Sequence, residues 1–110
     1  MEYAKLGKSG IEVSRLCVGC MSFGRPSEDF HEWTLNPNET EEIVKKALDL
    51  GINFFDTANT YSHGTSEEYL GRALKKNIAR NKVVIGTKVY FNEGHLSKEA
   101  VRREIDGSLK

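Results

Sequence analysis

Three residues of this chain, Asp56, Tyr61 and Lys88, are of types that could carry out proton chemistry together. Asp56 ends an apolar run, Tyr61 follows in a short polar loop, and Lys88 ends the next apolar run. A free phenol is a weak acid with a pKa of about 10, and a nearby ammonium group stabilises its phenolate form. A carboxylate keeps that ammonium charged and in place. We therefore predict that Tyr61 donates a proton, tuned by Lys88, which Asp56 supports.

Each of the three residues also has an ordinary structural explanation. An Asp at a strand end is often a turn residue, a Lys there is usually solvated, and a loop Tyr often covers a core. The catalytic interpretation depends on the three side chains meeting at one edge of a sheet. Side chains that share such an edge and perturb one another are typical of functional sites.

Short apolar runs predict the strands that would make this edge. Three of them, Leu16 to Cys20, Ile52 to Asp56 and Lys82 to Lys88, are expected to be buried strands. The first 16 residues predict a hairpin, because "EYAKL" and "IEVSRL" flank the glycine-containing turn "GKSG". Residues 21–37 show no clear period and are expected to form a long loop.

Amphipathic segments predict three helices between and after these strands. The first is "NETEEIVKKALDLG", which ends at Gly51, a typical C-terminal capping residue. The second is expected to begin at Thr65, which has capping-box spacing to Glu68. The third is expected to be capped by Ser97 and to continue to the last residue of the chain.

Alternation of apolar strands with amphipathic helices indicates parallel βαβ units in one domain, or in part of one. Two architectures fit this order, an open doubly wound sheet and a (β/α)8 barrel. A dinucleotide-binding doubly wound sheet would carry GxGxxG after the first strand, and Gly19 and Gly24 do not have that spacing. A full barrel needs about 250 residues. The chain would supply three of the eight units.

Cys17 and Cys20 form a CxxC pair in a strand-like run. Reactive pairs usually lie at a helix N-terminus, and a zinc site would need a second pair of ligands. We therefore expect both cysteines to be packing residues. The three histidines do not have the spacing of metal ligands, and no metal site is expected.

Composition argues against several classes of function. Of the 110 residues, 16 are Lys or Arg and 16 are Asp or Glu, so nucleic-acid binding is not expected. No apolar run approaches the roughly 20 residues of a membrane helix, and the N-terminus lacks the apolar core of a signal peptide. We expect a cytoplasmic protein that does not bind membranes.

Three segments together resemble the N-terminal part of an aldo-keto reductase. They are "LGKSGIEVSRLCVGCMSFG", "EEIVKKALDLGINFFDTANTYSHGTSEEYLGRALK" and "VVIGTKVYF". The sequence Gly51, Ile52, Asn53 is closer to the bacterial and potassium-channel β-subunit branch than to the familiar mammalian members. The resemblance implies a (β/α)8 TIM barrel, of which residues 1–16 are the hairpin plug and residues 16–110 the first three βα units.

The resemblance also implies a function and a set of site residues. The family reduces aldehydes and ketones to alcohols with NADPH, using an Asp, Tyr, Lys and His tetrad, and Asp56, Tyr61 and Lys88 match its first three members. Further positions implied are Cys20, Met21 and Asp56 for the cofactor, and Trp33, Tyr90 and Phe91 for the carbonyl pocket.

The family's histidine and the loops that grip the adenosine phosphate would follow residue 110. We therefore expect this chain alone to be incomplete and inactive, and to self-associate, aggregate or stay partly molten unless other segments complete it. Two other functions remain open: an NADP-binding regulatory or structural subunit of the same fold, and an unrelated barrel enzyme for phosphorylated substrates.

Overall fold

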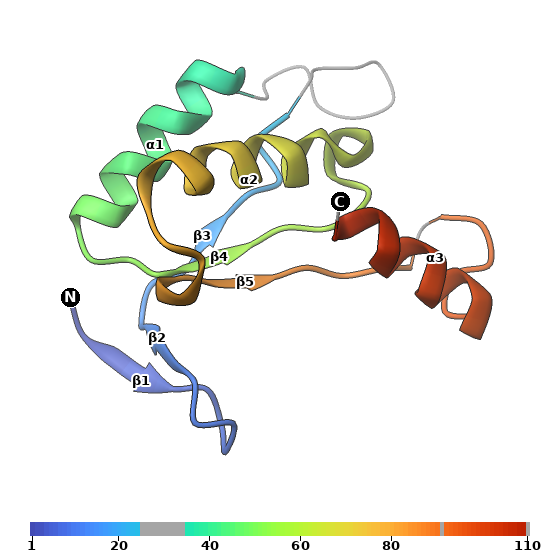
Figure 1. Ribbon diagram of the computed structural model, residues 1–110, viewed down its shortest axis with the longest axis horizontal. Coiled ribbons are helices and arrows are strands. Elements are labelled where there is room, and N and C mark those ends of the chain that lie inside the picture. Colours follow the sequence, from blue (N-terminus) through green and yellow to red (C-terminus); the bar gives the residue numbers. More distant parts are fainter. Residues whose placement is uncertain (25–34, 91, 110) are drawn as a thin grey trace.

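The computed structural model describes residues 1–24, 35–90 and 92–109, apart from the side chain of His63. Two sheets lie in this part of the chain, an antiparallel hairpin and a parallel sheet of three strands (Figure 1). Helices alternate with the parallel strands, so the predicted βαβ order is confirmed.

The N-terminal hairpin forms as predicted. Strand β1 (Tyr3–Lys5) pairs antiparallel with β2 (Glu12–Ser14). Gly7 and Gly10 in the turn between them have φ of 57° and 80°, which glycine adopts without steric cost. The hairpin is fixed to the parallel sheet by polar contacts, because Asn53 accepts a bond of 2.7 Å from the Ser14 amide.

The parallel sheet has the strand order β3, β4, β5. Its strands β3 (Val18–Gly19), β4 (Phe54–Asp56) and β5 (Val84–Gly86) are shorter than the apolar runs that predicted them. The ladder is short because β3 contributes only two residues to it. Single bonds extend the pairing, such as the Thr57 amide to the Gly86 carbonyl at 2.8 Å.

Two long helices follow β3 and β4. Helix α1 (Pro37–Asp49) begins at the N-cap Asn36, which forms a capping box with Glu39, and Gly51 follows its end with φ of 89°. Helix α2 (Thr65–Asn77) begins after a short 3₁₀ turn, η1 (Tyr61–Gly64).

The predicted capping box at the start of α2 is wrong. The N-cap is Gly64, with φ of 91°, and it has no side chain to accept a bond. Thr65 is already inside the helix, and its hydroxyl donates to the Ser62 carbonyl at 2.6 Å. The Thr65 hydroxyl is therefore already bonded within η1. The N-terminus of α2 begins at Gly64 without a side-chain cap.

A second 3₁₀ turn, η2 (Arg80–Lys82), leads into β5, and the last helix is α3 (Lys98–Ser108). Ser97 caps α3 as predicted and accepts a bond of 3.1 Å from the Ala100 amide. The prediction that this helix continues to the last residue is wrong. It ends at Ser108, with Leu109 as its C-cap.

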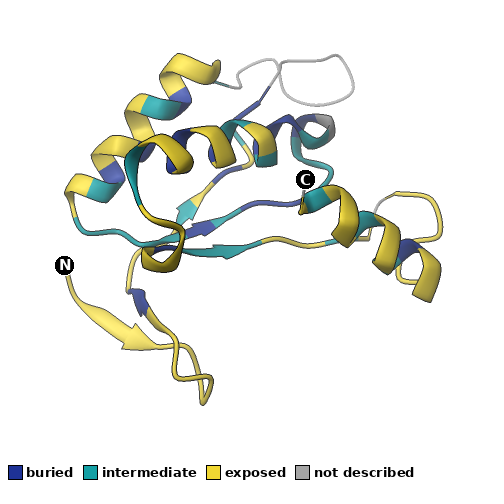
Figure 2. Cartoon of the chain, viewed as in Figure 1, coloured by how far each residue is buried: buried dark blue, intermediate teal, exposed yellow. Residues whose placement is uncertain are grey.

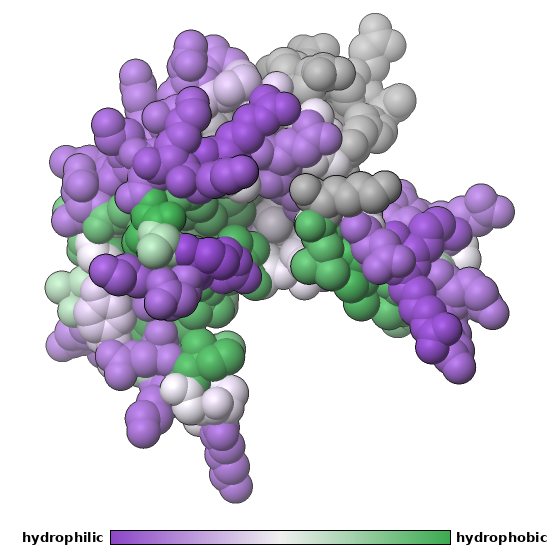
Figure 3. All heavy atoms as spheres, in the orientation of Figure 1, coloured by the Kyte–Doolittle hydropathy of each residue, from purple (hydrophilic) through white to green (hydrophobic). Residues whose placement is uncertain are grey.

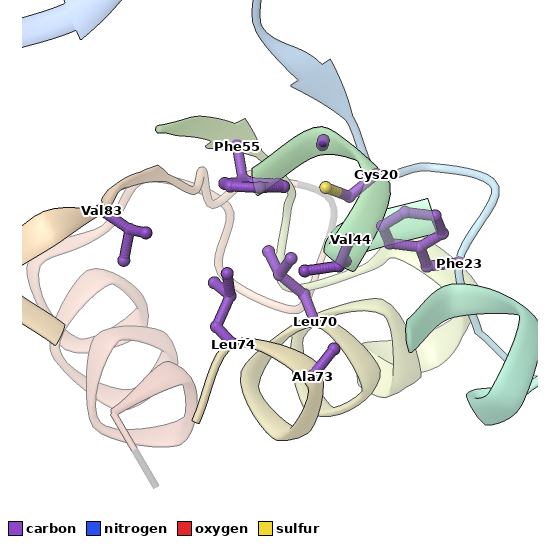
Figure 4. Packing of buried hydrophobic residues seen from close by; sticks show 9 residues of the cluster. Cys20, Phe23, Val44, Phe55, Leu70, Ala73, Leu74 and Val83 are labelled. Atoms are coloured by element: carbon purple, nitrogen blue, oxygen red, sulfur yellow. The ribbon is translucent and has the colours of Figure 1, made fainter. Parts of the chain in front are cut away.

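The core lies between the parallel sheet and the two long helices (Figure 2). Phe55 points into it from β4 and is fully buried, while its neighbours Phe54 and Asp56 are only half-buried. This alternation is the period of two expected of a strand, and it leaves Asp56 off the core face. The cluster around Phe55 (Figure 4) comprises Cys20, Phe23, Val44, Ala47, Leu70, Ala73, Leu74 and Val83.

The β5 edge of the parallel sheet is unpaired in the part of the chain that the structure describes. Strand β5 pairs there only with β4. An apolar groove of about 490 Å³ lies beside it, lined by Leu74 of α2, its C-cap Ile78 and Ile85 of β5, among others. The polar helices contrast with apolar surface beside the hairpin and α3 (Figure 3). Among the described helices, none has both the length and the apolar character needed to cross a bilayer.

We predict that Leu70→Ala destabilises the fold, because Leu70 is 1% exposed and packs in the cluster around Phe55. The loss should be about 2–5 kcal/mol in the free energy of unfolding, measured by urea denaturation of the natural full-length protein. Ile43→Ala removes a residue that is 47% exposed and should change stability by less than about 0.5 kcal/mol. Equal losses in the two variants would contradict this account of the core.

Candidate active site

The carboxyl ends of β4 and β5 carry the candidate site. In the parallel register Asp56 pairs with Gly86, so Lys88, two residues further along, follows the end of β5 beside Asp56. Gly86 has no side chain to separate the two strands at this point. A Cβ added there would lie 3.3 Å from Asp56 Oδ1, closer than most such contacts.

Asp56 and Lys88 form a salt bridge. The Lys88 ammonium donates to Asp56 Oδ2 at 3.0 Å and to the backbone carbonyl of Thr57 at 2.7 Å. Both side chains are 48% exposed, so the pair lies at the surface of the sheet edge and not in the core. The two acceptors, one charged and one from the backbone, fix the ammonium at the point where β4 ends.

Tyr61 completes the group of three. It is the first residue of η1, and its amide donates to the Ala58 carbonyl at 3.3 Å in the turn that comes just before η1. This turn brings the phenol ring back over the strand ends, where the Lys88 ammonium lies 4.8 Å from the ring centroid. An ammonium at this distance from a ring is within the range of cation–π attraction. The structure therefore brings together the three residues that the sequence predicted would meet.

The pKa of Lys88 is raised above its ordinary value of 10.5. Burial acts against this shift, because it disfavours the charged form. Hydrogen bonding to Asp56 and to Tyr61, together with the attraction between their charges, outweighs burial. Lys88 is consequently a permanent cation at neutral pH, held between a carboxylate and a phenol.

An apolar cavity of about 200 Å³ opens beside the Tyr61 and Lys88 side chains. Residues from the segments that follow β4 and β5 line it, namely Ala58, Asn59, Thr60, Tyr61, Lys88, Val89 and Tyr90. The mixture of an apolar wall with one phenol and one cation would suit a small molecule that carries a polar oxygen.

Of the three residues predicted for the carbonyl pocket, the structure places only Tyr90. Its side chain is 49% exposed, lines this cavity, and lies with its ring 4.7 Å from that of His95, centroid to centroid. Trp33 and Phe91 lie outside the described residues. Their predicted contribution to the pocket stays a prediction.

Of the two residues predicted to meet the cofactor after β3, Met21 is accessible and Cys20 is not. Cys20 is fully buried in the core, its amide donates to the Asp56 carbonyl at 2.8 Å, and its own carbonyl accepts from Ser66 at 2.6 Å. Burial leaves the Cys20 side chain no exposed surface, and its predicted contact with the cofactor stays a prediction. Met21 is 40% exposed.

Cys17 and Cys20 differ in their surroundings. Cys20 packs as predicted, but Cys17 is exposed, so its prediction as a packing residue is wrong. Burial raises the pKa of the Cys20 thiol to about 12 and is also the largest cause of the raised pKa of Cys17. Redox-active pairs have lowered thiol pKa values, so the pair does not have their character. Within the described residues, no three His, Cys, Asp or Glu side chains gather as metal ligands.

Three residues in or around the site were not among those predicted from the sequence. Thr57 holds Lys88 through its carbonyl, and a backbone contact leaves no trace in residue type. The Asn59 side chain, in the loop after β4, donates to Glu104 of α3 at 2.8 Å. Asn59 lies between Asp56 and Tyr61, within a segment that resembles the family, whereas Glu104 looks like any charged residue of an exposed helix face.

Comparison with known proteins gives consistent results. Residues 15–110 match the model of the Aldo/keto reductase family. Over 92 residues the chain is 51% identical to a versiconal hemiacetal acetate reductase of Aspergillus parasiticus, covering 83% of this chain and 26% of the relative. Over 117 residues it is 33% identical to a probable voltage-gated potassium channel subunit beta of Oryza sativa subsp. japonica, covering 100% of this chain and 33% of the relative.

A solved structure with the same fold is the holo form of the aldo-keto reductase AKR11C1 from Bacillus halodurans. It superposes with a TM-score of 0.78 at 32% identity, covering 99% of this chain and 35% of that chain. The structure therefore corresponds to an N-terminal portion of a (β/α)8 barrel, as the sequence predicted. The chain spans about a quarter to a third of the length of the relatives it matches.

We predict that Asp56→Asn lowers the pKa of Lys88, because burial then acts with less opposition. In the native protein the raised pKa means that the salt bridge contributes to the stability of the fold, fully below pH 10.5 while Asp56 is ionised. This stabilisation is lost as the pH rises through the raised value. An NMR titration of the Lys88 side chain measures the shift directly.

The matched control is Asp49→Asn, which removes an exposed carboxylate at the end of α1. Lys88 should titrate there as in the native protein. If both variants leave the Lys88 titration unchanged, the salt bridge is not what sets its pKa.

Proposed function

The chain belongs to the aldo/keto reductase family, and from this premise we propose that it carries the proton-donating part of an NADPH-dependent carbonyl reductase. The reaction would reduce an aldehyde or ketone to an alcohol. The single observation that carries the proposal is the meeting of Asp56, Lys88 and Tyr61 at the carboxyl ends of adjacent parallel strands. In barrels of this type, catalytic residues lie at those strand ends.

Tyr61 is the proposed proton donor. Its hydroxyl would transfer a proton to the carbonyl oxygen as that oxygen gains negative charge, which leaves a phenolate. The Lys88 ammonium stabilises this phenolate by its charge, and Asp56 and the Thr57 carbonyl hold the ammonium in place. Reduced nicotinamide, when bound, supplies the hydride that the carbonyl carbon accepts.

The residues at the strand ends fit a nicotinamide sugar. Asp56 uses Oδ2 for Lys88, and the absence of a Cβ at Gly86 leaves room around Oδ1, which can accept a bond from a hydroxyl group. Met21 is exposed after β3 and could pack against the same sugar. We assign Asp56 and Met21 to cofactor binding. We assign the apolar cavity beside Tyr61 and Tyr90 to the carbonyl substrate. The use of NADPH in particular rests on the family.

A second function has a specific observation in its favour. The rice relative is described as a potassium channel subunit beta, and it shares 33% identity over 100% of this chain. A regulatory or structural subunit would bind NADP through the same strand ends with negligible turnover. Turnover by the natural full-length protein distinguishes the two functions.

The open edge of β5 supports a further proposal about partners. Unpaired strand edges and apolar grooves favour association with other protein segments. We propose that the 110-residue chain by itself self-associates or is completed by further chain segments. We also propose a cytoplasmic location, with which the two free cysteines are consistent.

We predict that Tyr61→Phe in the natural full-length protein lowers kcat for carbonyl reduction by a factor of about 10²–10⁴, the usual worth of a positioned proton donor. NADPH affinity should stay within about a factor of two, because the ring and its contact with Lys88 are kept. Steady-state kinetics with an aromatic aldehyde and a fluorescence titration with NADPH measure the two quantities. Tyr69→Phe, the same change on α2, should leave kcat unaltered. Native turnover by Tyr61→Phe would refute the role of Tyr61.

For the isolated 110-residue chain we expect no saturable binding of NADPH by nicotinamide fluorescence in a dilute, monomeric sample. Sedimentation velocity should show concentration-dependent association, because the groove beside β5 is uncovered. A dilute monomer with sharp cooperative unfolding would contradict the proposed association. Micromolar NADPH binding by associated chains would indicate that the association completes the cofactor site.

A further inference from the structure

Glu104, on α3, bonds to both loops that surround the candidate site. Its Oε1 accepts from the Asn59 side chain at 2.8 Å and from the Asn92 side chain at 2.6 Å. Asn59 belongs to the loop between β4 and Tyr61, and Asn92 to the loop between Lys88 and α3. One carboxylate oxygen therefore joins the segment that carries Tyr61 to the segment that follows Lys88.

A backbone hydrogen bond also joins these two segments near Glu104. The Asn59 amide donates to the Lys88 carbonyl at 3.2 Å, so Asn59 contacts Lys88 by its backbone and Glu104 by its side chain. A cavity of about 540 Å³ lies next to them, lined by residues of these loops, of α3 and of the first turn of α2. Beside this cavity, the side-chain bonds from Asn59 and Asn92 to Glu104 join the two loops.

Helix α3 is held to the rest of the molecule mainly by polar contacts. Ala100 is its only buried residue, while Ile105 is 45% exposed and its C-cap Leu109 is 80% exposed. Near its end, Ser108 donates to Glu67 of α2 at 2.8 Å, and the same carboxylate oxygen accepts from Thr87 at 2.6 Å. Glu104 is thus placed by a helix that is itself fixed to α2 by Glu67.

We propose that Glu104 is a positioning residue that holds the Tyr61 loop over Lys88 by accepting hydrogen bonds from Asn59 and Asn92 together. This inference rests on the proposed function, because the geometry it protects is that of the proposed proton donor. The Glu104 side chain is 16% exposed and would not touch the reacting atoms.

The electrostatic surroundings of Glu104 suit this role. Hydrogen bonding from Arg103 is the largest cause of a lowered pKa at Glu104, followed by the bond from Asn92, and burial opposes both. The guanidinium of Arg103 donates to Glu104 Oε2 at 2.9 Å and also to the Glu93 carbonyl. The carboxylate is therefore ionised at neutral pH and can accept from both amides at once.

The test compares Glu104→Ala with two control variants in the natural full-length protein. Glu104→Gln keeps an oxygen able to accept from Asn59 and Asn92, although it loses the charge. Asp106→Ala removes an equal charge from an exposed position on the same helix. The two measurements are an NMR titration of Lys88 and the steady-state parameters kcat and KM.

We expect Glu104→Ala to lower the pKa of Lys88, because the contribution of Tyr61 to the raised value is weakened. It should also lower kcat on the order of tenfold, with KM for NADPH within about a factor of two, as expected when a reacting group is misplaced. Glu104→Gln and Asp106→Ala should leave both measurements close to native. If Glu104→Ala titrates like Asp106→Ala, the proposal is wrong.

Asn92→Ala keeps the test decisive if Glu104→Ala does not fold, because Asn92 is exposed in a loop. It should shift the Lys88 titration in the same direction by a smaller amount. Where Glu104→Ala does fold, adding Asn92→Ala to it should have no further effect. No shift in Asn92→Ala would overturn the proposal. If the native protein shows no turnover, the proposed function fails, while the Lys88 titration still decides whether Glu104 positions the Tyr61 loop.

Discussion

The parallel register between β4 and β5 is the constraint on which the candidate site depends. It sets Asp56 opposite Gly86, and so places the Lys88 ammonium 3.0 Å from the Asp56 carboxylate. A slip of one residue would turn Asp56 toward the core face, where Phe55 now lies, and would separate the pair. The register is fixed from the other side of the sheet, since the fully buried Phe55 has only one position in the core.

The molecule uses two kinds of packing for two purposes. Helices α1 and α2 are held by a continuous apolar cluster with the sheet, which is stable and tolerates no change of register. The loops after β4 and β5 and the helix α3 are held by individual polar bonds, among them those of Glu67 and Glu104. Such bonds define direction and distance more sharply than apolar contacts, which suits side chains that must meet a reacting group.

Much of the fold could be predicted from the chain because the signals were local. The hairpin around Gly7 and Gly10, the cap at Ser97 and the alternation of strands and helices all follow from the types and spacing of neighbouring residues. The errors arose where a distant or unusual contact decided the outcome. The η1 turn occupies Thr65, so the apparent capping box does not form, and the sheet buries Cys20 while leaving Cys17 exposed.

The sequence by itself determined which residues could do the chemistry, because an acid, a phenol and an amine each have to be encoded at a strand end or beside it. It placed Asp56, Tyr61 and Lys88 correctly at one edge, since parallel strands bring their carboxyl ends together. Only the tertiary structure decided that the Thr57 carbonyl holds Lys88, that Cys20 is fully buried in the core, and that Glu104 reaches both loops. Those contacts join residues whose types carry no signal of the partner, and only folding brings them within hydrogen-bonding distance.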